Sequence, residues 1–207
     1  MGRRSDHSRE ELRALMLRAA HEHLAEVGFA RFSAREVAKR VGYSIGSVYN
    51  VFGSLDALML AVNTRTFTEW VAHLEAALAA SGDDRIKALV EGYFSFAEAH
   101  PNLWMAIYDH RLPPDMAVPE ADAGERAALT GLVEGEVAAF LGRPRDAVTE
   151  RLNRSLIAIV HGHCSFALTG SFALLGESDA VGLALARVRE VLNAWRTPGA
   201  RLAEGDP

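Results

Sequence analysis

Residues 32–59 have the sequence FSAREVAKRVGYSIGSVYNVFGSLDALM, and this stretch decides the predicted fold. Ser33 and Glu36 have the spacing of a capping box, in which the serine hydroxyl accepts from the glutamate amide and the carboxylate reaches back. The pair predicts a helix that begins after Ser33 and runs to Arg40. Gly42 can adopt the positive φ that ends a helix and lets the chain turn within a few residues. A short helix followed by a tight turn is therefore expected.

The second helix of this stretch covers residues 45–51 and begins after Ser44, whose hydroxyl is placed to cap it. Val48 and Phe52 are its only strong apolar anchors, so its other side chains face outward. Gly46 weakens a helix by about 1 kcal/mol, which makes sense where the backbone must approach base edges. The outward side chains offer groups suited to phosphate and base contacts: Ser47, Tyr49 and Asn50. Together the two helices predict a helix-turn-helix whose second helix enters the major groove.

Residues 42–46, GYSIG, also fit the G-x-S-x-G pattern of a hydrolase nucleophile elbow. An elbow requires a strand that runs into the serine and a helix that runs out of it. Here a helix precedes the serine, and no alternating strands and helices follow. Ser44 is therefore interpreted as a helix cap, no catalytic residue is predicted, and an enzyme is the third alternative.

The rest of the sequence also favours helices. An apolar periodicity predicts a helix over residues 9–27, and a segment of about 27 residues that begins at Ser54 would form a helix of ~40 Å, long enough to join two domains. Five further helices are predicted at residues 83–100, 101–110, 120–141, 145–172 and 178–195. No strand alternation or internal repeat is recognisable. The predicted fold class is all-α, with about nine helices.

The charge of the chain is unevenly distributed. The formal net charge is −5, but residues 1–53 contain nine Arg and Lys against six Asp and Glu, so they carry +3 and the remaining residues −8. Such asymmetry indicates that only the first part faces a polyanion. We therefore expect a helix-turn-helix domain over residues 1–53, a second domain over 54–196, and a flexible tail over 197–207.

The composition also indicates a compartment. A single cysteine, Cys164, excludes an internal disulfide and a zinc site of several cysteines, and it fits a reducing compartment. Charged residues crowd the N-terminus, where a signal peptide would need an apolar segment. The longest apolar runs, such as residues 156–160, are far shorter than the ~18 residues of a membrane span. A cytoplasmic protein without a membrane partner is expected.

Taken as a whole, residues 32–59 resemble the DNA-binding segment of the TetR family of bacterial repressors. The family has the same glycine at the turn, a tyrosine at the position of Tyr49, an aromatic residue at Phe52, and a small-Ser-x-acid-x-Leu start to the fourth helix. The match covers about residues 8–60. It implies a homodimer that binds a palindromic operator in double-stranded DNA, with a larger C-terminal helical domain for dimerisation and for a small-molecule effector.

The resemblance also implies roles for individual residues. It brings Arg35 within reach of a base or phosphate, and it assigns Tyr49 and Val51 to the DNA backbone. The family usually has lysine where this chain has Leu55, so one phosphate contact is missing; Arg3, Arg4, Arg9 or Lys39 can compensate for it. The residues expected at the DNA are Ser33, Arg35, Ser44, Ile45, Gly46, Ser47, Tyr49 and Asn50.

The last two helices are the candidates for the dimer interface. Their apolar stripes consist of Leu156 and Val160 on one helix, and of Val181, Leu185, Val188 and Leu192 on the next. Two such hairpins can form an isologous four-helix interface, as these helices do in the resembled family. The alternative is that both stripes face the core of their own chain.

The segment Val160-His161-Gly162 resembles the W-H-G element of one TetR subgroup, with valine in place of tryptophan. In such domains the surrounding helices enclose a pocket for a small effector, and the composition here favours an apolar or aromatic molecule. The candidate pocket residues are Phe67, Trp70, Tyr93, Phe94, Trp104, Met105, Tyr108, His161 and Phe166.

Two other interpretations remain beside the regulator. His161 and Cys164 share a helix face at i, i+3, but two ligands do not make a metal site, so neither a metal nor a cofactor is predicted. The runner-up function is a helical small-molecule binding protein without DNA function, which the missing lysine at Leu55 supports.

Overall fold

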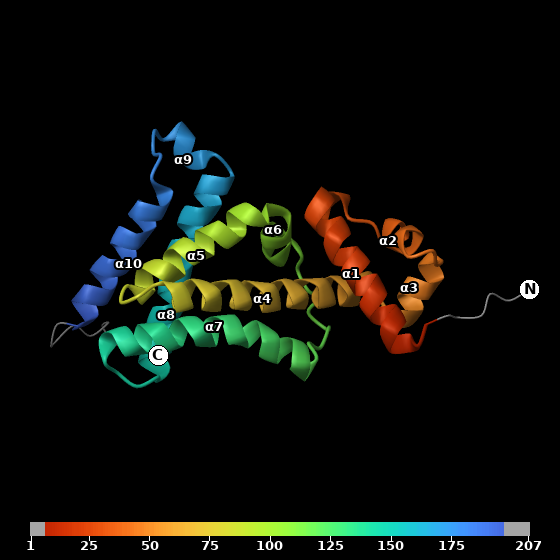
Figure 1. Cartoon of the computed structure of the whole chain (residues 1–207), viewed down its shortest axis with the longest axis horizontal. Coiled ribbons are helices and arrows are strands. Elements are labelled where there is room, and N and C mark those ends of the chain that lie inside the picture. Colours follow the sequence, from red (N-terminus) through yellow and green to blue (C-terminus); the bar gives the residue numbers. More distant parts are fainter. Residues whose placement is uncertain (1–6, 197–207) are drawn as a thin grey trace, which may run out of the picture. The chain divides into compact units, whose positions relative to one another are not determined.

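The computed structural model describes residues 7–196, and this part of the chain is helical without any strand (Figure 1). Its elements are α1 (Arg9–Val27), the 3-10 turn η1 (Phe29–Arg31), α2 (Ala34–Arg40), α3 (Ile45–Phe52), α4 (Leu55–Ala80), α5 (Arg85–Ala99), α6 (Pro101–Asp109), α7 (Glu120–Leu141), α8 (Ala147–Leu168), α9 (Ser171–Leu174) and α10 (Ala180–Arg196). The all-α prediction is confirmed. The predicted tail at 197–207 and the arginines Arg3 and Arg4 lie outside the described residues.

The helix boundaries follow the local signals with one clear exception. Gly42 has a φ of 73° and lies two residues beyond the end of α2, as predicted. The helix predicted over residues 145–172 instead ends at Leu168, because Gly170 has a φ of 75° and interrupts the helical conformation. The short helix α9 then follows, so the described residues contain ten α-helices rather than about nine.

The predicted capping box at the start of α2 is wrong. The Ser33 side chain makes no capping hydrogen bond. The Glu36 carboxylate lies along the helix instead, with Oε2 3.6 Å from Nζ of Lys39. A complete capping box occurs at α1, where the Ser8 amide donates to Glu11 Oε2 at 2.7 Å and the Glu11 amide donates to Ser8 Oγ at 3.2 Å. Lys39, three residues after Glu36, therefore competes for the carboxylate that the sequence spacing assigned to the cap at Ser33.

The described chain divides into two compact units. The N-terminal unit comprises residues 7–70 and 100–127, and the C-terminal unit comprises residues 71–99 and 128–196. Helices α4 and α7 contribute residues to both units. The predicted boundary at residue 54 separates a DNA-binding domain from an effector-binding and dimerisation domain, and it stays a prediction.

In the N-terminal unit, helices α1, α2, α3 and α6 and the first part of α4 share one core. Members with an exposure of 2% or less include Met16, Ala20, Leu24, Val37, Val48, Leu58, Val62 and Leu103. Burying one such side chain contributes about 1.5–3 kcal/mol. Val48 is the only buried residue of α3. The partly buried Val51 and Phe52 pack against the same core, so one side of α3 holds the helix and its outer face is left for other contacts.

In the C-terminal unit, α8 and α10 form a hairpin that passes through α9, and α5 packs against both (Figure 1). Side chains that this packing buries include Ile86, Phe94, Leu156, Cys164, Leu185 and Leu192. Within residues 7–196 no single helix has the length and apolar composition to cross a membrane, although α3 and α4, bent by 70°, satisfy these two criteria as a pair.

Candidate DNA-binding surface and interior cavity

The turn between α2 and α3 is held by short local hydrogen bonds. The Tyr43 amide donates to the Ala38 carbonyl at 2.9 Å, which closes the end of α2. Ser44 Oγ accepts from the Ser47 amide at 3.1 Å and lies 3.0 Å from Ser47 Oγ. Ser44 thus caps α3, and the element that leads into it is a helix. This geometry lacks the strand that a nucleophile elbow requires.

The outer face of α3 presents the residues that sequence patterns assigned to DNA. Ile45 is 38% exposed and Tyr49 is 40% exposed. Gly46 and Asn50 are also exposed, whereas Ser47 is half-buried. At 3.6 residues per turn, the four exposed residues lie within one arc of the helix, away from the buried Val48. The structure therefore brings these predicted residues together on a single outward face.

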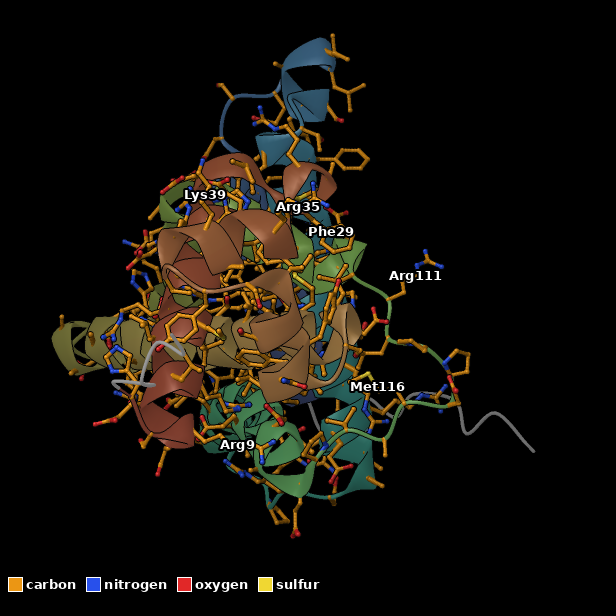
Figure 2. All side chains as sticks on the ribbon, turned by 90° about the vertical axis from the view of Figure 1, so that its right-hand side faces the viewer. Arg9, Phe29, Arg35, Lys39, Arg111 and Met116 are labelled. Carbon is orange, nitrogen blue, oxygen red and sulfur yellow. The ribbon has the colours of Figure 1, made fainter. Side chains whose placement is uncertain are left out.

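Two further predicted DNA residues, one at the N-cap of α2 and one on the helix itself, are also accessible. Ser33 is half-buried, and its hydroxyl takes no part in capping the helix. Arg35 is exposed, and no carboxylate of residues 7–196 pairs with its guanidinium. Figure 2 shows Arg35 and Lys39 on neighbouring turns of α2, at the outer side of the N-terminal unit. The positive charge of Arg35 is thus available to a phosphate.

The remaining basic residues of α2 are engaged within the protein. Lys39 lies near Glu36, and Arg40 binds the Glu26 carboxylate of α1 with two hydrogen bonds. The hydrogen bonds from Arg40 lower the pKa of Glu26, and the same contact raises the pKa of Arg40. Arg40 therefore has a structural role, and Arg35 carries the unpaired charge of this helix.

The position where the resembled family carries lysine is apolar and exposed in this chain. Leu55 begins α4 and is 42% exposed. One cation lies near α3: the Arg13 guanidinium carbon is 5.1 Å from the centre of the Phe52 ring. This cation–π contact orients the Arg13 side chain against α3. No spacing rule reveals such a contact between distant residues.

The C-terminal unit contains a cavity of about 50 Å³. Aliphatic side chains of α5, α7, α8 and α10 line it, together with Leu74 of α4 and the ring of Tyr93. Tyr93 is one of the predicted effector residues. Val160 and Val188, which were predicted at the dimer interface, line this cavity too. The lining of this cavity is thus apolar, with one phenol at its wall.

The other predicted effector residues are divided between the two units. In the C-terminal unit, the Tyr93 hydroxyl lies 3.0 Å from Nδ1 of His161, whose burial lowers its pKa. Phe94 is buried in the core, and Phe166 is 48% exposed. The N-terminal unit contains the stacked pair Phe67 and Trp70, the edge-to-face pair Trp104 and Tyr108, and the half-buried Met105. Only Tyr93 and His161 come together beside the cavity.

The predicted interface stripe is directed largely into its own chain. Five of its six members are 9% exposed or less: Leu156, Val160, Leu185, Val188 and Leu192. The sixth, Val181, is half-buried. Their burial favours the alternative in which the stripe belongs to the core. Large exposed apolar side chains occur instead at Phe166 of α8, which is 48% exposed, and at the α9 end of the hairpin, where Leu174 is 89% and Leu175 71% exposed.

The His161 and Cys164 pair acquires no further ligands. Within residues 7–196 there is no group of three or more His, Cys, Asp and Glu side chains that could hold a metal ion. Cys164 is fully buried, and burial raises the pKa of its thiol to about 12. A thiol in this environment stays protonated and is a poor nucleophile or metal ligand.

Two family models match the chain. The model described as bacterial regulatory proteins, tetR family, matches residues 16–62, which contain α2 and α3. The model described as tetracyclin repressor-like, C-terminal domain, matches residues 86–188, which contain most of the cavity lining. Together the two matches cover most of the chain.

Curated proteins with similar sequences are helix-turn-helix regulators of mycobacteria. An uncharacterized HTH-type transcriptional regulator of Mycobacterium tuberculosis is 35% identical over 83 residues, which cover 37% of this chain and 43% of the relative. The HTH-type transcriptional activator FasR of Mycolicibacterium smegmatis is 32% identical over 104 residues, which cover 49% of this chain and 48% of the relative. The chain therefore spans about half the length of these relatives.

Solved structures with similar folds align over nearly the whole chain. A protein of unknown function from Rhodococcus sp. RHA1 has a TM-score of 0.70 and 24% identity, and the alignment covers 93% of this chain and 98% of that chain. The regulator FadR of Bacillus subtilis in complex with stearoyl-CoA has a TM-score of 0.60 and 14% identity, and the alignment covers 91% and 99% of the two chains. At these identities the likeness concerns the fold alone.

Proposed function

This chain belongs to the TetR family of bacterial regulatory proteins, and from that premise we propose that it is a homodimeric repressor of transcription in the cytoplasm. Two copies bind a palindromic operator in double-stranded DNA through α3, and a small apolar effector in the C-terminal unit releases them. The observation that carries the proposal is the exposed outer face of α3 together with the unpaired guanidinium of Arg35 on α2.

The chemistry of this surface suits a DNA groove. The amide of Asn50 can donate to and accept from one adenine edge, the commonest use of asparagine in base recognition. The Tyr49 hydroxyl and the free Ser33 hydroxyl suit phosphate oxygens, and Arg35 neutralises a phosphate or reads a base. Gly46 leaves the first turn of α3 without a side chain at the point of closest approach. These groups supply positioning contacts and base contacts on one face.

Dimerisation uses the exposed side of the α8–α10 hairpin in this proposal. Ile159, Phe166 and Phe172 line one shallow apolar depression there, and the exposed Leu174 and Leu175 follow in the chain. Contiguous exposed apolar surface of this kind marks an interaction site. A second copy that binds through the same patch forms an isologous interface, which can hold two α3 helices at the ~34–36 Å spacing of successive major grooves.

The effector acts by favouring one of two arrangements of the dimer. The cavity of about 50 Å³ is far below the roughly 300–1,000 Å³ of ordinary ligand pockets. A ligand must therefore widen the C-terminal unit, and this need links binding to a conformational change. A coupling of about 1–3 kcal/mol changes DNA occupancy roughly 5- to 150-fold. The stearoyl-CoA of FadR supports an apolar ligand, whereas the name of FasR leaves activation as the alternative to repression.

The test is DNA recognition itself. Genomic DNA that co-purifies with the protein is sequenced, and the enriched fragment is titrated by fluorescence anisotropy between 50 and 200 mM salt. We expect tight binding that falls steeply with salt, because basic side chains release counterions from the phosphates and added salt opposes this release. We expect Asn50→Ala to weaken binding by about 1–3 kcal/mol. Failure to enrich any fragment, or a flat salt response, contradicts the proposal.

A second candidate function rests on one observation. Leu55 gives α4 an exposed apolar residue where the resembled family carries a phosphate-binding lysine. If the chain binds small molecules without binding DNA, thermal stabilisation by a ligand occurs while no genomic fragment is retarded. This result would assign the protein to the class of helical small-molecule binding proteins.

A further inference from the structure

Asn153 of α8 is a buried amide without a partner in the described chain. Its exposed fraction is 0%, and within residues 7–196 neither its Nδ2 nor its Oδ1 makes a hydrogen bond to another protein group. Buried polar side chains are normally paired, because an unpaired amide loses the hydrogen bonds that it makes with water in the unfolded chain. Both hydrogen-bonding atoms of this amide are therefore available to a group that is not part of this chain.

The position of Asn153 connects it with the cavity. Asn153, Leu156, Ile157 and Val160 follow the i, i+3, i+4, i+7 spacing of one helix face, and the last three line the cavity. One turn of helix rises about 5.4 Å, so Asn153 lies about one turn from the aliphatic wall. Its complete burial within one chain also excludes contact with a second copy. A molecule in the widened cavity can therefore reach this amide.

At the opposite end of this helix face, the nearest polar side chain already has a partner within the protein. Nδ1 of His161, which follows Val160, lies within hydrogen-bond distance of the Tyr93 hydroxyl, at 3.0 Å. No charged side chain lines the cavity, and an unpaired charge in such surroundings is strongly disfavoured. The polar group of a bound molecule therefore has to be uncharged and located at the Asn153 end.

On the basis of the proposed function, we propose that the effector is an uncharged amphiphile whose head group both donates to and accepts from Asn153. Its apolar part occupies the aliphatic cavity toward Val160. A primary amide suits the asparagine side chain best, because two amides pair through two reciprocal hydrogen bonds. The distance along α8 from residue 153 to residue 160 is about 10 Å at 1.5 Å per residue. This length suits an extended chain of about eight carbons.

The experiment uses octanamide as the probe, with octanoate and octylammonium as charged controls of equal length. Calorimetric titration of the full chain should show binding of octanamide, and at least tenfold weaker binding of both charged controls. The Asn153→Leu variant should bind octanamide at least tenfold more weakly than the unsubstituted protein. Equal affinity in the variant, no detectable octanamide binding, or equally tight octanoate binding overturns the proposal.

Asn63 offers a matched control in the N-terminal unit. It is 2% exposed, and its Nδ2 donates to the Ala106 carbonyl at 3.4 Å, whereas its Oδ1 has no partner within residues 7–196. Asn63→Leu should leave octanamide affinity unchanged. If Asn153→Leu does not fold, NMR of the unsubstituted protein with ¹⁵N-labelled asparagine tests the same contact. Octanamide should shift the side-chain amide signal of Asn153 and leave that of Asn63 unchanged. An unshifted Asn153 signal at saturation, or a long-lived water that stays on this amide, overturns the proposal.

The octanamide experiment and the DNA experiment can fail independently of each other. If the protein retards a genomic fragment but ignores octanamide, this inference fails and the proposed regulator stands. If octanamide binds through Asn153 but no fragment is retarded, the inference stands and the proposed DNA function fails. Release of the retarded fragment by octanamide, and its loss in Asn153→Leu, supports both.

Discussion

Arg40 of α2 binds Glu26 of α1 through two parallel hydrogen bonds, with Nη1 2.9 Å from Oε1 and Nη2 2.5 Å from Oε2. This fork geometry is specific to the planar guanidinium, so lysine cannot replace it. The pair joins the first helix of the N-terminal unit to the helix that precedes the turn. Arg35 lies on the same helix without such a partner. Two arginines that look alike in the sequence therefore have different roles.

Arg35→Ala should weaken DNA binding without lowering the Tm. In the proposed complex the substitution removes one phosphate contact, so the slope of log affinity against log salt should decrease by about 1. Arg40→Ala is the matched control on the same helix, and we expect it to lower the Tm because Glu26 loses its partner. Anisotropy and thermal unfolding measure the two effects. Equal salt slopes for Arg35→Ala and the unsubstituted protein contradict a phosphate contact at this position.

Gly46→Ala should stabilise the protein while it weakens DNA binding. A Cβ at this position meets only Ser44 Oγ, at 3.6 Å, so the substitution fits the free protein. Alanine favours a helix by up to about 1 kcal/mol over glycine, and this gain should appear in chemical unfolding. In the proposed complex the added methyl group faces the DNA, so affinity should fall. A variant that gains stability and keeps full affinity shows that the first turn of α3 does not approach base edges.

Acid should destabilise the N-terminal unit through His23. This side chain of α1 is 5% exposed and packs 5.5 Å from the Phe32 ring. Burial, with a smaller effect of Arg40, lowers the pKa of His23 in the folded state. The unfolded chain then binds more protons below its own pKa of about 6.5, so stability is fully present above that value and decreases as the pH falls toward the folded pKa.

The measurement is the Tm between pH 7.5 and pH 5, followed for the unsubstituted protein and for His23→Leu. The unsubstituted protein should lose stability over this range, and the variant should lose less, because one proton-binding site of the unfolded chain is gone. Identical slopes for the two proteins exclude His23 as the source.

Phe166→Glu should produce folded monomers. The side chain is 48% exposed on the apolar side of the hairpin, so a charge there is tolerated in the single chain but is disfavoured between two copies. Leu192→Glu is the contrasting variant, because Leu192 is 0% exposed and a charge at this position should unfold the C-terminal unit. Light scattering and circular dichroism distinguish the two results. A dimer that survives Phe166→Glu removes this patch from the proposed interface.

The helices and the turn were predictable because they depend on signals within a few residues. Gly42 supplies a positive φ, Ser44 supplies the cap of α3, and apolar periodicity marks the remaining helices. The failed capping box at Ser33 shows the limit of such signals, since Glu36 has a second possible partner at Lys39. A local pattern determines structure only where no neighbour competes for the same group.

The orientation of each helix about its own axis required the tertiary structure. Helix α8 carries apolar residues around much of its circumference, so its periodicity cannot tell a core face from an interface, and the packing of α5 and α10 decides that Leu156 and Val160 point inward. The same packing leaves Asn153 buried without a protein partner and divides the aromatic residues between two units. Backbone conformation depends on near neighbours along the chain. Burial depends on which distant helices meet, and this information is spread over the whole sequence.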